Sequence, residues 1–150
     1  MQTNSDFRDL FAALNAGDAE YLVVGALALA AHGHVRATKD LDVWVGASPE
    51  NAERVYRALA VFGAPLHDLT VKDLASSDLI FQIGVPPLRV DIITSIDGVE
   101  FVDAWREKMS SEYADQPVHV LSRRHLIQNK KAAGRLQDLA DVEALEKGPG

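Results

Sequence analysis

Three aspartates lie in apolar, β-prone segments, where an unpaired carboxylate is costly. Asp40 and Asp42 are two residues apart in Asp-Leu-Asp-Val-Trp-Val, and Asp91 lies in Arg-Val-Asp-Ile-Ile. Because strand side chains alternate between faces, Asp40 and Asp42 should point the same way and share a cation. Hard carboxylate oxygens suit Mg²⁺, which commonly keeps several waters and adds substrate phosphates to its ligands. The pattern predicts a magnesium site, with room for two ions about 3.5 to 4 Å apart that hold a triphosphate and its leaving pyrophosphate.

The spacing of the three aspartates is also compatible with an interpretation in which they bind no metal ion. Asp40 could cap the loop before its strand, Asp42 could pair with Arg36 or Lys39, and Asp91 could pair with Arg89. The segment upstream favours the metal site. Gly25 follows an apolar strand and precedes an alanine-rich helix, so phosphate could approach free backbone N–H groups there. A tight turn or close packing would explain Gly25 equally well by itself.

The elements that position these residues alternate between strand and helix patterns. The predicted strands cover 21–24, 41–45, 79–83, 88–93 and 118–121, with 84–87 as a hairpin-like link. The predicted helices cover 7–16, 26–31, 49–62, 99–109, 122–134 and 136–147, with a capped turn at 70–73. We expect one α+β domain over residues 1–150, a mixed sheet covered by helices with a helical C-terminal segment.

Composition restricts the classes of function. The chain has no cysteine, which removes disulfides and thiol nucleophiles, and its formal net charge of −7 argues against coating long nucleic acids. The polar N-terminus and the short apolar run at 21–31 predict a cytoplasmic protein with no membrane partner. Five positive charges near the C-terminus form either a solvated helix face or a phosphate-facing patch: Arg123, Arg124, Lys130, Lys131 and Arg135.

These motifs resemble the nucleotidyltransferase superfamily of DNA polymerase beta, whose pattern is a strand, a glycine turn, a helix, then Asp-x-Asp and a later third acid. The small bacterial AbiEii-toxin-like branch is the closer resemblance. It carries Arg-x-Thr-x-Asp-x-Asp, and a C-terminal lysine followed by Gly-Arg and two aspartates. The matching residues here are Arg36, Thr38, Asp40 and Asp42, then Lys130, Gly134, Arg135, Asp138 and Asp141.

The resemblance implies a set of roles. Asp40, Asp42 and Asp91 would be catalytic and would bind Mg²⁺, and Asp91 would help to activate the acceptor hydroxyl. The nucleotide-binding residues would be Gly25, Ala26, Arg36, Thr38 and Lys130. Ala26 stands where many members have serine, so a hydroxyl contact to phosphate is missing.

Three functions remain in competition. The first is transfer of a nucleoside monophosphate from a nucleoside triphosphate to a hydroxyl on RNA, such as tRNA, on a protein or on a small molecule. The second is a catalytically weak binding module of a toxin–antitoxin pair, suggested by Ala26 and by the short chain. The third is a metal-dependent phosphohydrolase, against which the glycine turn argues.

Overall fold

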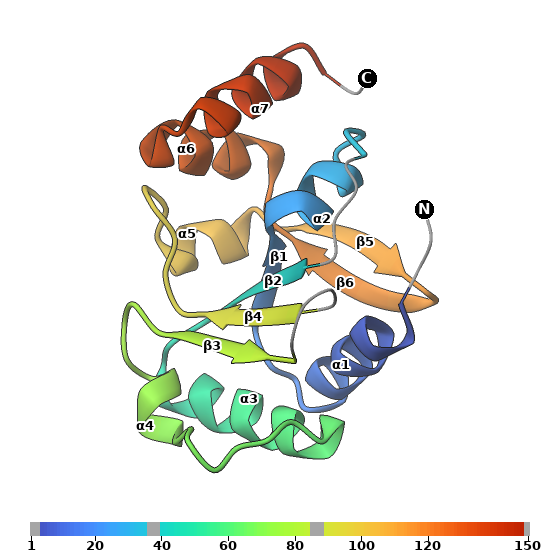
Figure 1. Cartoon of the computed structure of the whole chain (residues 1–150), viewed down its shortest axis with the longest axis vertical. Coiled ribbons are helices and arrows are strands. Elements are labelled where there is room, and N and C mark those ends of the chain that lie inside the picture. Colours follow the sequence, from blue (N-terminus) through green and yellow to red (C-terminus); the bar gives the residue numbers. More distant parts are fainter. Residues whose placement is uncertain (1–3, 36–39, 85–88, 149–150) are drawn as a thin grey trace.

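The computed structural model describes residues 4–35, 40–84 and 89–148, and these form a mixed six-stranded sheet with helices around it (Figure 1). The strand order is β3-β4-β2-β1-β6-β5. The strands are β1 Tyr21–Val24, β2 Asp40–Val45, β3 Ile80–Ile83, β4 Arg89–Ile93, β5 Met109–Tyr113 and β6 Gln116–Val120. The helices are α1 Ser5–Ala16, α2 Gly25–Ala31, α3 Pro49–Phe62, α4 Val71–Leu74, α5 Phe101–Arg106, α6 Arg123–Ala133 and α7 Leu136–Glu146.

The two faces of β2 have different roles. Leu41, Val43 and Val45 are fully buried on the face that also carries Tyr21 of β1, because Tyr21 and Val45 are direct partners in the antiparallel pair. Helix α1 covers this face and stacks Phe11 on Tyr21, with 6.0 Å between ring centroids. The opposite face therefore presents the two aspartates of β2, followed by Trp44.

Trp44 belongs to the core. Its indole is 1% exposed and meets the ring of Phe101 in α5 edge to face, at a centroid distance of 5.1 Å. A strand tryptophan beside the acids could in principle stack a nucleotide base, and this burial excludes that role. Helix α5 therefore covers this sheet face at Trp44. The part of the face that carries Asp40 and Asp42 lies toward α2.

Capping explains several helix boundaries. Ser48 accepts a hydrogen bond from Asn51 N and Pro49 follows it, so α3 starts as predicted, and Gly63 ends it in the left-handed region. The predicted capping box of Thr70 and Asp73 is present at α4. Helix α1 starts earlier than predicted, because the side chain of Asn4 caps it in place of Asp6.

The predicted helix 99–109 is wrong at both ends. Helix α5 covers only Phe101–Arg106, and Met109 begins the edge strand β5. Strand β5 pairs antiparallel with β6 through a turn in which Ala114 and Asp115 have positive φ angles of 47° and 70°. The polar sequence Met-Ser-Ser-Glu-Tyr lacks the apolar alternation of a half-buried strand, so pairing with β6 decides its conformation. The link 84–87 lies outside the described residues apart from Gly84, but β3 and β4 are antiparallel neighbours as expected.

Helices α6 and α7 form a helical hairpin at one end of the molecule (Figure 1). Ser122 caps α6 by accepting a hydrogen bond from His125 N, and Gly134 ends the helix at a φ of 69°. None of the helices in the described ranges combines the length and the apolar character that a bilayer span requires.

Candidate active site

The pairing of β2 with β4 brings the three predicted acids together. These strands are parallel, with Asp42 opposite Asp91 and Asp40 opposite Arg89. Direct partners in a sheet share a face, so all four side chains lie on the face that α5 and α2 border. The predicted triad is thus one cluster on adjacent strands, with a guanidinium among its carboxylates.

Arg89 bridges two of the three acids. Its Nε lies 3.1 Å from Asp91 Oδ1, and its Nη2 lies 3.5 Å from Asp40 Oδ2 and 3.4 Å from Asp91 Oδ2. The ion pair between Asp91 and Arg89, which the interpretation without a metal ion predicts, is therefore present. The predicted partners Arg36 and Lys39 of Asp42 lie outside the described residues.

Asp42 carries the main electrostatic cost of the cluster. Burial raises its pKa most, the nearby Asp91 and Asp40 raise it further, and Arg89 lowers it, so that the carboxyl titrates at about 6. The face is therefore short of positive charge even with Arg89 in place.

Gly25 lies directly against this cluster. It has a φ of 71°, and a Cβ built on it would come within 2.5 Å of Asp42 Oδ2. Both the left-handed backbone and the close approach of the carboxylate require a residue without a side chain. The glycine turn and the acid pair, which are separate motifs in the sequence, are thus in contact.

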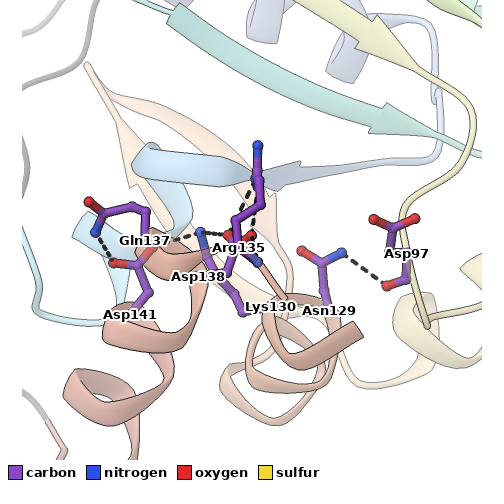
Figure 2. A network of polar contacts seen from close by, with 7 residues as sticks. All are labelled: Asp97, Asn129, Lys130, Arg135, Gln137, Asp138 and Asp141. Carbon is purple, nitrogen blue, oxygen red and sulfur yellow. Dashed lines mark hydrogen bonds and ion pairs between the residues drawn. The ribbon is translucent and has the colours of Figure 1, made fainter. Parts of the chain in front are cut away.

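The other predicted nucleotide-binding residues divide into three cases. Ala26 is half-buried in the first turn of α2, next to Gly25. Arg36 and Thr38 lie outside the described residues. Lys130, by contrast, is turned into a buried network between α6 and α7, where Nζ lies 2.9 Å from Asp141 Oδ2 and 3.5 Å from Asp138 Oδ1 (Figure 2).

This C-terminal network is mainly structural. Asp138 and Asp141 are 2% and 3% exposed, and Arg135 Nε donates to Asp138 Oδ2 at 2.7 Å, which helps to hold the pKa of Asp138 below its ordinary value. The predicted basic patch is also largely neutralised, since Arg124 pairs with Glu107 and Lys131 with Glu146. Arg124, Lys130, Lys131 and Arg135 thus each have a carboxylate partner, which argues against a phosphate-facing role for most of this patch.

The same helices are attached to the loop that follows β4. Asn129 Nδ2 donates to Asp97 O at 3.0 Å (Figure 2), and Gln128 Nε2 donates to Gly98 O at 2.6 Å. A Cβ on Gly98 would lie 2.5 Å from Ala132 Cβ, so the loop touches α6 closely. The hairpin of α6 and α7 is in this way coupled to the strand that carries Asp91.

The donor set fits a divalent cation. Carboxylate oxygens are the ligands that Mg²⁺ prefers, and Asp91 Oδ1 is buried without a hydrogen-bond partner in the described part of the chain. With the side chains in their present rotamers, residues 4–35, 40–84 and 89–148 contain no group of three His, Cys, Asp or Glu residues that could hold a metal ion. Binding by all three carboxylates would require them to turn toward one another.

A pocket of about 350 Å³ lies beside α2, and Val23 in its lining belongs to the sheet face opposite the acids, because it is the direct partner of Val43. Leu27, Ala30 and Ala31 of α2 form one wall, and the hairpin of β5 and β6 forms the other with residues that include Tyr113 and Val120. Helix α2 thus borders both this pocket and, through Gly25, the carboxylate cluster.

Arg89 is the site residue whose importance the sequence did not reveal. Its position two residues from Asp91 on the same strand face suggests only a pairing with that acid. Its contact with Asp40 depends on the register between β2 and β4, which no local pattern specifies. The one available signal was a basic residue on the same face of a strand as a lone acid.

Sequence comparison gives no match: neither a protein-family model nor a curated protein matches the chain. Solved structures do match. A protein assigned as a nucleotidyltransferase from Thermotoga maritima (TM1012) has a TM-score of 0.61 at 19% identity, covering 97% of this chain and 94% of that one. The antibiotic-resistance factor ANT(2'')-Ia has a TM-score of 0.64 at 13% identity, covering 95% and 82%.

The lincosamide antibiotic adenylyltransferase LnuA, solved with lincomycin bound, has a TM-score of 0.60 at 13% identity. The match covers 96% of each chain. Agreement over nearly the whole length, with the mixed sheet and its surrounding helices, establishes the architecture. The protein has the nucleotidyltransferase fold.

Proposed function

We propose that this protein is a metal-dependent nucleotidyltransferase that transfers a nucleoside monophosphate from a nucleoside triphosphate to a hydroxyl acceptor and releases pyrophosphate. The observation that carries the proposal is the contact between the glycine turn and the acid cluster, in which Gly25 touches Asp42 and Asp42 faces Asp91. The fold alone would not carry it, because one fold hosts many functions.

Each residue has a defined part in this reaction. Asp40, Asp42 and Asp91 would hold Mg²⁺, which when bound supplies charge stabilisation for the triphosphate and the leaving pyrophosphate. Gly25 and Ala26 would offer backbone N–H groups to the phosphates, without the hydroxyl that a serine at position 26 would add. Asp91, 14% exposed and beside Arg89, would help to remove the proton of the acceptor hydroxyl. Roles for Arg36, Thr38 and Lys130 near the phosphates remain predictions.

The structural neighbours favour a small molecule as the acceptor. Two of the structural neighbours, LnuA and ANT(2'')-Ia, were solved with lincomycin and with adenylyl-2''-tobramycin respectively.

The experiment that tests the function is calorimetric titration with each of the four ribonucleoside triphosphates, with and without Mg²⁺. The native protein should bind at least one of them only with Mg²⁺, and the double variant Asp40→Ala, Asp42→Ala should bind none. Where an acceptor is found, Asp42→Ala should lower the rate at least about 10²-fold, the scale of losing one preorganised charge stabiliser. Unchanged turnover would refute the assignment, and release of inorganic phosphate in place of pyrophosphate would indicate a phosphohydrolase.

A binding module of a toxin–antitoxin type is the second candidate, and the surface of α7 is the observation that favours it. Leu136 and Leu139 lie three residues apart on this helix and are 89% and 49% exposed. Exposed apolar side chains at helical spacing are typical of a face that meets another protein. Absent nucleotide binding, together with a partner whose binding is lost in Leu136→Glu, would favour this function over transfer.

A further inference from the structure

Arg89 occupies the acid cluster itself. Parallel pairing sets it directly opposite Asp40, with Asp42 and Asp91 as the next pair along the same two strands. The four side chains therefore form a square of three carboxylates and one guanidinium. A cation that binds between Asp40 and Asp91 would therefore occupy the space in which the guanidinium of Arg89 already contacts both carboxylates.

The contacts of Arg89 are loose. Its Nε is 3.1 Å from Asp91 Oδ1, but the two atoms do not have hydrogen-bond geometry, and both are buried without such a partner among the described residues. Its remaining contacts are 3.4 and 3.5 Å long. The side chains of Arg89 and Asp40 are 30% and 46% exposed, a setting in which ion pairs stabilise little. Breaking the contact with Asp40 would therefore be inexpensive, whereas the pair with Asp91, whose side chain is 14% exposed, would be released only when another cation takes the place of the guanidinium.

Electrostatic repulsion would act on Arg89 once a metal enters the cluster. A divalent ion held by Asp40 and Asp91 would lie next to the guanidinium, and the two positive groups would repel each other. A triphosphate brings new negative charge to the same place. Arginine is well suited to it, because its planar fork binds phosphate oxygens in a bidentate manner.

We propose that Arg89 is a displaceable cation, which neutralises Asp40 and Asp91 while no metal is bound and turns to the triphosphate when a divalent ion takes these carboxylates. The inference rests on the proposed function. It makes Arg89 both a competitor of the metal and a nucleotide-binding residue. A permanent structural ion pair would behave differently, since its loss would disorder the carboxylates and weaken metal binding.

The test compares Arg89→Gln and Arg89→Lys with the native protein. Arg57→Gln is the matched control, because Arg57 is an exposed arginine on α3 paired with Glu53 at 3.4 Å, so it removes one positive charge elsewhere. Free Mn²⁺ is measured by electron paramagnetic resonance at pH 8 without nucleotide. Tripolyphosphate binding is then measured calorimetrically at saturating Mn²⁺, which removes any dependence on the base. Circular dichroism verifies folding.

Arg89→Gln should bind Mn²⁺ about tenfold more tightly than the native protein, the effect of removing one positive charge close to the ion. It should bind tripolyphosphate about tenfold more weakly. Arg89→Lys should keep native Mn²⁺ affinity but lose tripolyphosphate affinity, since an ammonium lacks the fork. Arg57→Gln should change neither.

Several results would overturn the inference. Folded Arg89→Gln with equal or weaker Mn²⁺ binding would make Arg89 a structural partner only. If that variant does not fold, native tripolyphosphate affinity in Arg89→Lys would have the same meaning. A native protein that binds Mn²⁺ and nucleotide, with Arg89 variants that bind both equally well, refutes this inference alone. A native protein that binds neither refutes the proposed function as well.

Discussion

Replacing Gly25 with alanine tests the contact on which the site depends. The substitution combines two effects that can be separated. The first is backbone strain, because Gly25 has a φ of 71° and a left-handed conformation costs a residue with a Cβ about 1–2 kcal/mol. The second is a collision, because the added methyl carbon would come within 2.5 Å of Asp42 Oδ2, where ordinary contacts are 3.4 Å or longer.

The collision sets the size of the functional effect. To restore an ordinary contact, the Asp42 carboxylate must withdraw by about 1 Å, and a misplacement of that size can cost about 10² in rate. The strain sets the effect on stability. For a domain of this size, about 1–2 kcal/mol corresponds to a lowering of Tm by roughly 2–8 °C.

Gly63→Ala is the matched control. Gly63 also has a positive φ, 96°, but no heavy atom lies within 4 Å of its built Cβ, and it ends α3 away from the acids. The control should therefore lose stability and keep native binding of Mn²⁺ and nucleoside triphosphate. Differential scanning calorimetry gives the stability, and isothermal titration gives the binding. If Gly25→Ala binds metal and nucleotide as well as Gly63→Ala does, the contact between Gly25 and Asp42 has no functional importance.

Three further predictions concern charge. Asp42→Asn should raise the unfolding free energy of the metal-free protein by about 1–3 kcal/mol at pH 8, because a carboxyl whose pKa is raised to about 6 opposes folding when it is ionised. The same variant should no longer bind the metal. Chemical denaturation at pH 8 and at pH 4 should show the gain in stability only at pH 8. In the native protein without metal, the stability that Asp42 contributes is fully present below its unfolded pKa near 3.8 and is lost as the pH rises through about 6. The affinity for Mn²⁺ should change in the opposite direction and fall as the pH drops through the same range. A constant affinity between pH 5 and 7 would contradict the assignment of Asp42 as a ligand. Lys130→Met should lower the unfolding free energy measured in urea by about 3–5 kcal/mol, because it leaves Asp138 and Asp141 buried without their shared cation. Lys131→Met breaks an exposed pair with Glu146 and should lower it by about 1 kcal/mol or less.

Local sequence patterns determined most of the elements and placed the candidate acids on their strands. The two-residue spacing of Asp40 and Asp42 placed both on one strand face, since alternation is a property of any extended chain. Stop and start signals such as Ser48-Pro49 and Gly134 act within a few residues and correctly predicted the helix boundaries beside them. The glycine turn before α2 was also evident, because its backbone conformation is a local requirement.

Only the tertiary structure decided how these pieces meet. The register that sets Asp42 against Asp91 and Arg89 against Asp40 joins strands about fifty residues apart, and no local pattern encodes such a pairing. The same is true of β5, a polar segment that becomes a strand because β6 offers it a partner. Lys130 illustrates the difference most clearly: the sequence shows a lysine within a basic run, whereas folding buries its charge between Asp138 and Asp141, because a charge removed from water must be paired.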